Sequence, residues 1–434
     1  MAAVSGSRSA VIVGGARTPF AKAWGALRRV PAWDLGRIAA SEAIARSTLD
    51  PEEIDEVIFG NIAQPADATN IARVIALRSG LPRSTPAYTV NRNCASGIQA
   101  IVDAALRIES GLADVIVAGG TESMSQIPFF YRPETQDLFL EAGRARSFWR
   151  RMSIFMKLRP RHFRPVVALE VGLTDPVAGL NMGETAEVLA KRFHIPREEQ
   201  DRFALESHRR VARATESGRF REEIAPVFLA PDYGDAVADD VGFRAHQSLE
   251  ALAKLRPVFD RRFGTVTAGN SSQITDGAAA LVLASEERAR ETGVAILGRI
   301  RSWGFAGCDP ATMGLGPVYA TPIALRRGGA ALRDVKLIEI NEAFAAQVIA
   351  CERAFASREF AEKELGLASP IGEIDRSVTN VNGGAIALGH PVGCTGARLV
   401  LTLCHELARR GKDLGLATLC VGGGQGAALL IERV

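Results

Sequence analysis

The sequence predicts an α/β protein built from two similar halves. Short apolar runs alternate with longer segments whose apolar residues recur at helical spacing, and glycine clusters follow several of the apolar runs. This alternation is typical of α/β proteins with a parallel sheet. At 434 residues the chain is too long for one simple core, which favours two or more domains.

The first part of the chain has the clearest alternation. Apolar runs predict strands at residues 10–13, 54–59, 88–90 and 114–118. Helical spacing predicts helices near residues 34–47 and 70–79 and directly after Cys94. Gly14 and Gly15 are expected to follow the first strand, and the apolar run before them is far too short for a signal peptide or a membrane span.

The second part of the chain repeats this order coarsely. In EEIDEVIFGNI (52–62) and in RDVKLIEINEA (333–343) a charged turn leads into a strand. Each half then continues with a strand, a loop rich in polar or small residues, a helix and another strand. A glycine cluster ends both units, at residues 119–120 and at residues 422–424. We therefore expect a duplicated α/β half, with the loops of both halves meeting at a shared face.

Composition excludes several classes of protein. The chain is 47% hydrophobic and 23% charged, which is ordinary for a soluble globular protein, and its net charge of +3 is too small to argue for nucleic-acid binding. Its six cysteines form no CxxC pair and no His/Cys ligand spacing, so we expect reduced thiols in a cytoplasmic protein without a metal site. No Walker loop or dinucleotide-binding glycine loop of the right form appears in the sequence, so phosphate binding by a P-loop is not expected.

Cys94 lies where a predicted strand passes into a predicted helix, in YTVNRNCASGIQAIVDAA (88–105). The unpaired N–H groups and the positive dipole end of such a helix favour thiolate over thiol, so we expect a nucleophilic sulfur at neutral pH. The small residues 95–97 leave room for a substrate. Most free cysteines are ordinary buried residues, and this motif alone leaves that alternative open.

Three more sites lie at predicted strand ends or tight turns in the second half. His390 stands on a turn between glycine clusters, Cys420 ends a buried strand, and Asn341 follows the strand in IEINEAFA (338–345). Strand ends are where ligands bind in α/β sheets. From the residues alone, Asn341 could equally cap a helix and Cys420 could belong to the core. Other histidines and cysteines are expected to serve packing or to lie at the surface, namely His162, His194, His208, His246, His405, Cys394 and Cys404.

Four segments resemble the signature loops of the thiolase family, in the order that the family has them. They are CASG from Cys94, NEAF from Asn341, GHP with His390 in its middle, and CVG from Cys420. ARTPF (16–20), VIVAGGTESMS (115–125), MGETAE (182–187) and TVTAGNSSQITDGAAA (265–280) also resemble that family, so the likeness covers nearly the whole chain. It implies the thiolase fold, in which two similar α/β halves pack as αβαβα layers around central helices.

The resemblance also implies a loop domain over the active site. We expect the N-terminal half at residues 1–124, continued by 275–298, and the C-terminal half at residues 299–434. The loop domain would then span residues 125–274 and contain a basic insertion near 142–169.

The activity implied by the resemblance is that of an acyl-CoA:acetyl-CoA C-acyltransferase. Such an enzyme cleaves 3-ketoacyl-CoA with CoA through an acyl-cysteine intermediate and can run in reverse as a Claisen condensation. The reaction needs a nucleophile, a base for its proton and a second acid/base at carbon, roles that suit Cys94, His390 and Cys420. By resemblance, His390 and a water oriented by Asn341 hold the enolate oxygen, and the N–H groups of Cys94 and Gly422 hold the second oxyanion.

Other functions remain as alternatives. One is a short-chain acetyl-CoA C-acetyltransferase that makes or cleaves acetoacetyl-CoA. Another is a non-catalytic acyl-CoA-binding or structural subunit of a β-oxidation complex, against which the intact Cys94, His390 and Cys420 argue. A decarboxylating condensing enzyme of the same fold would be expected to carry two active-site histidines, whereas Cys420 stands at the second site here.

Coenzyme A is the expected substrate, and no permanently bound cofactor is expected. By resemblance, Arg244 lies near the nucleotide, Ser272 lies on the TAGNSS turn, and Met182 lines the pantetheine. Many short-chain thiolases have a histidine just before the MG pair, whereas this chain has Asn181. The resemblance also implies a homodimer or homotetramer.

The insertion is unusually basic. No acid occurs from residue 142 to residue 169, and Trp149, Met152 and Phe155 recur at helical spacing, which predicts a basic amphipathic helix. The eight basic residues are Arg144, Arg146, Arg150, Arg151, Lys157, Arg159, Arg161 and Arg164. Such a helix either packs on its own domain or docks on an anionic membrane surface or a partner subunit. An insertion of this kind resembles that of thiolase subunits of fatty-acid β-oxidation complexes.

Overall fold

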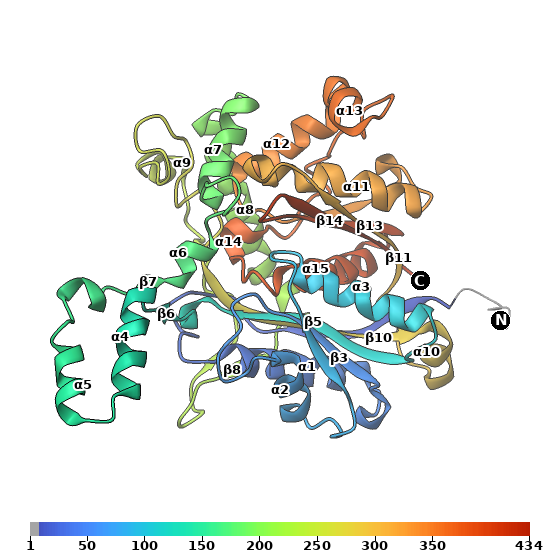
Figure 1. Ribbon diagram of the computed structural model, residues 1–434. Helices are drawn as coiled ribbons and strands as arrows, with labels where there is room; N and C mark the ends of the chain where they lie inside the picture. The colour runs from blue at the N-terminus through green and yellow to red at the C-terminus, as the bar shows by residue number, and fades with distance from the viewer. Residues whose placement is uncertain (1–7) are drawn as a thin grey trace.

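The computed structural model describes residues 8–434, in which two similar α/β halves pack against each other (Figure 1). In the N-terminal half the sheet order is β1, β10, β5, β3, β4. These strands are β1 (Ala10–Arg17), β10 (Thr275–Ser285), β5 (Val115–Ser123), β3 (Glu56–Gly60) and β4 (Ala87–Val90). A short strand, β2 (Ala21–Lys22), pairs with the start of β10.

The C-terminal half repeats this order. Its strands are β11 (Gly298–Gly307), β14 (Gln425–Glu432), β13 (Leu414–Val421) and β12 (Leu337–Ile340), and two residue pairs between β1 and β11 join the sheets. Ile58 pairs in parallel with Tyr88 of β4, and the equivalent Ile338 pairs in parallel with Thr379. The predicted duplication is therefore confirmed strand by strand.

The prediction of a parallel sheet is wrong for most of the strand pairs. Among the paired strands of the main sheet within residues 8–434, β3–β4, β3–β5 and β12–β13 are parallel and the other pairs are antiparallel. In the C-terminal half, a tight turn with positive φ at Gly423 and Gly424 returns the chain from β13 into β14, and strands joined by such a turn must be antiparallel. In the N-terminal half, residues 124–274 occupy the place of that turn between β5 and β10.

The first strand also differs from the prediction, because β1 runs through Gly14 and Gly15 instead of ending before them. The register shifts between Ile12 and Gly14, which marks a bulge. A Cβ atom on Gly14 would lie 2.7 Å from the Ala43 carbonyl oxygen, so this glycine lets α1 (Ala32–Ser47) pack directly on the strand.

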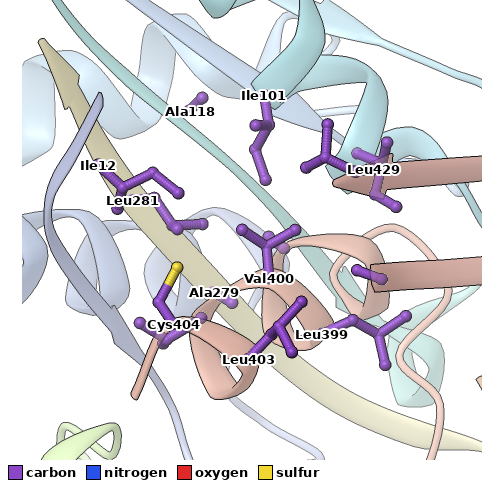
Figure 2. Packing of buried hydrophobic residues seen from close by; sticks show 14 of the residues in the cluster. Ile12, Ile101, Ala118, Ala279, Leu281, Leu399, Val400, Leu403, Cys404 and Leu429 are labelled. Carbon is purple, nitrogen blue, oxygen red and sulfur yellow. The ribbon is translucent and has the colours of Figure 1, made fainter. Parts of the chain in front are cut away.

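Helices form three layers around the two sheets. Figure 1 shows α3 (Ser96–Glu109) and α15 (Thr395–Arg410) between the sheets, α1 and α2 (Ile71–Arg78) outside the N-terminal sheet, and α11 (Gly316–Arg327) and α12 (Ala345–Ala356) outside the other. Figure 2 shows how Ile101 of α3 and Val400 of α15 face side chains of both sheets in the central core. The αβαβα arrangement is therefore confirmed.

The segment between β5 and β10 covers one edge of these layers. It contains α7 (Met182–Arg192), α8 (Arg197–Glu216), α9 (Leu249–Ala253) and the short strand pairs β6 (Phe129–Phe130) with β7 (Val166–Val167) and β8 (Val227–Phe228) with β9 (Ala236–Val237). Beyond the β6–β7 pair, α4 (Pro133–Arg144) and α5 (Phe148–Phe155) form a helical hairpin that projects away from the body (Figure 1). No helix within residues 8–434 is both long and apolar enough to cross a membrane.

The remaining helices lie on the periphery or in the turns. They are α6 (Ala168–Gly172), α10 (Glu286–Thr292), α13 (Arg358–Leu365) and α14 (Ala385–Leu388), the last of which directly precedes the His390 turn.

Candidate active site

Cys94 lies between the end of β4 and the first turn of α3, as predicted. Asn93 before it has a φ of +43°, a left-handed conformation that asparagine tolerates better than most residues. The Ser96 hydroxyl accepts a hydrogen bond from the Arg92 N–H (2.9 Å) and donates to the Asn93 carbonyl (2.7 Å). This local network fixes the sharp turn that presents the thiol at the helix N-terminus.

The helix N-terminus is expected to favour the thiolate form of Cys94, but the pKa of this thiol is raised rather than lowered. Burial raises its pKa, and the backbone N–H groups of Gly422 and of Cys94 itself offset this only in part. The buried Glu122 carboxyl nearby raises the pKa further. In the free protein the sulfur is therefore protonated at neutral pH, and a nucleophilic role requires a base.

His390 has the protonation state that such a base needs. Burial, and then the Arg398 charge, lower its pKa to about 4, so the imidazole is neutral at pH 7. Its Nδ1 atom lies 2.6 Å from the Thr395 hydroxyl oxygen, and that hydroxyl also lies 3.0 Å from the Pro391 carbonyl, to which it donates. Because the hydroxyl proton is used on Pro391, we assign the ring proton to Nδ1, which leaves a lone pair on Nε2.

Asn341 directly follows β12, and its side chain contacts the ring of His390. Its Nδ2 atom is 3.5 Å from Nε2 of His390, and the side chain is fully buried. Within the described part of the chain, its Oδ1 atom has no hydrogen-bond partner. A buried amide oxygen without a protein partner fits a position that orients a water or a substrate group.

Cys420 is the penultimate residue of β13 and is buried. Burial raises its pKa well above the usual value, and the nearby Cys94 raises it further. This cysteine is therefore a proton donor in the resting protein rather than a second thiolate. Gly422, two residues on, is tied to the Cys94 turn because the Asn93 side-chain amide donates to its carbonyl (2.8 Å).

The candidate catalytic side chains surround a cavity of about 460 Å³. Cys94, His390 and Cys420 all line it, although they come from three separate segments of the two halves. Lining residues also include the three expected to contact coenzyme A, Met182, Arg244 and Ser272. Six of the predicted site residues thus line one cavity. The other two lie next to lining residues: Asn341 contacts His390, and Gly422 is hydrogen-bonded to the Cys94 turn.

Sequence reasoning missed two residues of this site. His208 was expected to serve packing, yet this buried side chain lines the cavity, and its Nδ1 accepts a hydrogen bond from the Arg244 backbone N–H (3.1 Å). Burial lowers its pKa to about 4, so it is neutral. No motif marks this histidine, because it lies on the polar helix α8 and faces the site only through tertiary packing.

Glu122 is the other missed residue. Its buried carboxyl accepts hydrogen bonds from the backbone N–H groups of Ile62, Ala63 and Gly393 and from the Asn61 amide, at 3.0–3.1 Å. It therefore ties the loop after β3 to the turn that follows His390. Burial raises its pKa to about 7, although the four N–H donors around it favour the ionised form.

Cys394 and Cys404 are fully buried, as expected. In residues 8–434, no group of three or more His, Cys, Asp or Glu side chains is placed to hold a metal ion.

Comparisons with known proteins agree with this geometry. The family model "Thiolase, N-terminal domain" matches residues 10–287, and "Thiolase, C-terminal domain" matches residues 294–433. The chain belongs to the thiolase family. This thiolase is 44% identical, over 97% of its length and 96% of the relative, to a 3-ketoacyl-CoA thiolase of Yersinia enterocolitica.

Solved thiolase structures superpose closely on this one. Human mitochondrial 3-ketoacyl-CoA thiolase is 40% identical with a TM-score of 0.85, covering 98% of this chain and 99% of its own. The Bacillus anthracis acetyl-CoA acetyltransferase is also 40% identical, with a TM-score of 0.86 and 99% coverage of both chains. The human protein has also been solved in complex with CoA.

Proposed function

We propose that this thiolase is a 3-ketoacyl-CoA thiolase, which uses CoA to cleave 3-ketoacyl-CoA into acetyl-CoA and an acyl-CoA shortened by that unit. The observation that carries this proposal is the convergence of Cys94, His390 and Cys420 on one cavity. A protonated thiol beside a neutral imidazole and a second protonated thiol supplies a nucleophile, a base and an acid, which the reaction needs in that order.

In the first half-reaction, Nε2 of His390 takes the Cys94 proton and the sulfur attacks the ketone carbon. The tetrahedral centre then collapses, the bond between the two carbons breaks, and an acetyl-CoA enolate leaves. Cys420 donates its proton to the enolate carbon and becomes a thiolate. The shortened acyl group remains on Cys94 as a thioester.

In the second half-reaction, the Cys420 thiolate takes the proton of an incoming CoA thiol. The CoA sulfur attacks the acyl-Cys94 carbonyl, and Cys94 leaves as a thiolate that recovers its proton from His390. Both thiols and the imidazole return to their resting states, so the cycle balances and is reversible as a Claisen condensation.

Each oxyanion needs donors that are already in place. We assign the enolate oxygen to His390 and a water oriented by Asn341, whose unpartnered Oδ1 supports this role. We assign the tetrahedral oxyanion to the backbone N–H groups of Cys94 and Gly422, both of which act on the Cys94 thiol in the resting site.

Coenzyme A is proposed as a substrate rather than a resident cofactor. Arg244, Ser272 and Met182 are its proposed contacts, and their place on the cavity wall supports them. His208 would hold the Arg244 loop in position through its hydrogen bond to the Arg244 backbone.

The test is CoA-dependent cleavage of 3-ketoacyl-CoA substrates from four to sixteen carbons, with a Cys94→Ser variant as the control. Cleavage across the series supports the proposal. Activity confined to acetoacetyl-CoA would instead identify a short-chain acetyl-CoA C-acetyltransferase, an alternative that the Bacillus anthracis structure keeps open. Full turnover by the Cys94 variant, or acyl-CoA binding without turnover, would refute the catalytic assignment.

We also propose the domain limits stated above, with residues 125–274 as the loop domain. The β5–β10 connection supports them, because it replaces the tight turn between β13 and β14. A cytoplasmic location is proposed on the six free cysteines. A homodimer or homotetramer, and association with a multifunctional β-oxidation subunit, are proposed from family resemblance and are tested by light scattering of the purified protein with and without a candidate partner.

The α4–α5 hairpin is our proposed contact with an anionic membrane surface. Along α5 and its C-cap the hairpin exposes Phe148, Trp149, Met152 and Met156, with Trp149 80% exposed, while Ile154 packs inside the hairpin. Of its basic residues, Arg151 caps α4 through the Ala142 and Ala145 carbonyls, and Lys157 pairs with Glu141. Within the described chain the six other arginines form no ion pair, so their charge is available to lipid headgroups.

Vesicle binding tests this contact. Binding to anionic vesicles should weaken with salt, be lost in the triple variant Arg146→Gln, Arg150→Gln, Arg161→Gln, and weaken in Trp149→Ala. Neutral vesicles are the control. Absence of binding at every salt concentration would remove the membrane proposal and leave a partner subunit as the candidate for this surface.

A further inference from the structure

Trp24 is an unusual residue at the mouth of the cavity. Its side chain lines the cavity but is 58% exposed, and its backbone has a φ of +62°. A bulky residue with positive φ is strained, and such strain persists only where the surroundings hold it.

Three contacts impose this conformation on Trp24. Its N–H donates to the Ser125 hydroxyl (2.6 Å), and that hydroxyl donates to the Asp276 carboxylate, which also accepts the Ser125 N–H (2.8 Å). On one side, Ala23 donates its N–H to the Ile274 carbonyl (2.8 Å), and on the other Gly25 donates to the Lys22 carbonyl (3.0 Å). The Trp24 backbone is thus held at the cavity edge by the segment directly after β5 and by the start of β10.

Beside Trp24, the cavity lining includes Lys22 and a group of apolar side chains. Met124, Ile274 and Val392 line the cavity and pack in one hydrophobic cluster with Ala23. By contrast, Arg244, Gln247 and Ser272 give the cavity a polar and cationic wall that suits the CoA phosphates and amides. In a 3-ketoacyl-CoA, the polar CoA moiety lies on one side of the reacting carbons and the apolar acyl chain lies on the other. The polar wall therefore suits the CoA moiety, and the apolar wall suits the acyl chain.

Building on the proposed function, we propose that Trp24 is a specificity residue, which covers the acyl chain of longer 3-ketoacyl substrates along the apolar wall formed by Met124, Ile274 and Val392. A four-carbon substrate ends before it reaches the indole, whereas each further methylene that touches the ring is removed from water. The site would therefore favour longer chains by contacts at Trp24 rather than by different chemistry.

The experiment compares wild type, Trp24→Ala, Trp24→Phe and Trp149→Ala on 3-ketoacyl-CoA substrates of four to sixteen carbons. We expect Trp24→Ala to lower kcat/KM roughly tenfold for the longest substrate and to leave the four-carbon substrate within about twofold, since each buried methylene contributes a factor of a few. Trp24→Phe should keep most of the long-chain activity. Trp149→Ala, on the distant hairpin, should match wild type at every length.

Three outcomes separate the explanations. Equal losses at all chain lengths together with a raised KM for CoA would place the nucleotide, not the acyl chain, on Trp24 and overturn the inference. Unchanged kinetics in Trp24→Ala would also overturn it while leaving the proposed function intact. If wild type cleaves no substrate, the proposed function itself fails, and this result is distinct from the other two.

Discussion

At the scale of single residues, both cysteine thiols of the site are protonated in the resting protein and the His390 imidazole is neutral. Cys94 and Cys420 have raised pKa values and His390 has a lowered pKa, all chiefly because of burial. Moving one proton from Cys94 to His390 therefore creates a buried ion pair that the resting protein avoids. The pre-set N–H donors and the bound substrate must stabilise that charge during the reaction.

The lowered pKa of His390 predicts the acid side of the pH profile. Because the imidazole remains neutral until the pH approaches about 4, kcat/KM should stay flat as the pH falls from neutral through the usual histidine range. It should then decrease as His390 becomes protonated and can no longer accept the Cys94 proton. Cleavage of acetoacetyl-CoA in buffers of constant ionic strength measures this limb, and a midpoint near the ordinary histidine pKa would contradict it.

Thr395 is predicted to fix the tautomer of His390. In Thr395→Val the acceptor for Nδ1–H is lost, so the ring can rotate or shift its proton, and kcat should fall roughly 10- to 100-fold with little change in the KM for CoA. Thr395→Ser keeps the hydroxyl and should retain most activity. A Val variant that melts like wild type and turns over normally would show that this hydrogen bond has no positioning role.

Single residues also mark the limit of sequence-based prediction. The positions of Cys94 and Cys420 near strand ends, and of His390 on a turn, could be predicted because strand, turn and helix patterns are local. The charge state of Cys94 could not, since it depends on burial by both halves and on Glu122. His208 was missed for the same reason, because its place in the site is set by tertiary packing of α8 and not by a motif.

At the scale of elements, the two central helices begin in very close contact. A Cβ atom on Gly97 of α3 would lie 2.6 Å from the Ala397 backbone nitrogen of α15. Both helices start at candidate catalytic turns, so this contact sets the spacing between the Cys94 and His390 turns. The sequence predicted the helices but not their contact, because glycines in helices do not reveal what they pack against.

Gly97→Ala is therefore expected to destabilise the protein by about 1–3 kcal/mol, since the clash is with backbone atoms that cannot move away alone. Urea denaturation measures the change, and activity should fall with it because the two turns separate. Gly143→Ala is the matched control, since a Cβ there meets nothing within 4 Å on the exposed helix α4. The control should lose no stability, and equal losses in both variants would contradict the packing argument.

At the scale of the whole molecule, the hairpin of residues 131–165 is separate from the catalytic body. It has its own small core of Ala142, Ala145, Ile154 and Leu138, and it leaves and re-enters the body through the paired strands β6 and β7. Phe130 pairs with Val166 in that ladder, so the two strands can be joined directly. The unusual composition of this segment was visible in the sequence, but its projection away from the body was not.

Replacing residues 131–165 by an Asn-Gly turn between Phe130 and Val166 tests this separation, because a two-residue turn fits an antiparallel pair of this register. We expect the shortened protein to fold and to cleave acetoacetyl-CoA at the wild-type rate, since the cavity wall at Met124 and Ile274 remains. Binding to anionic vesicles should be lost at all salt concentrations. Loss of acetoacetyl-CoA cleavage in a folded deletion variant would show that the hairpin supports the site itself, whereas retained vesicle binding would place the membrane contact elsewhere on the body.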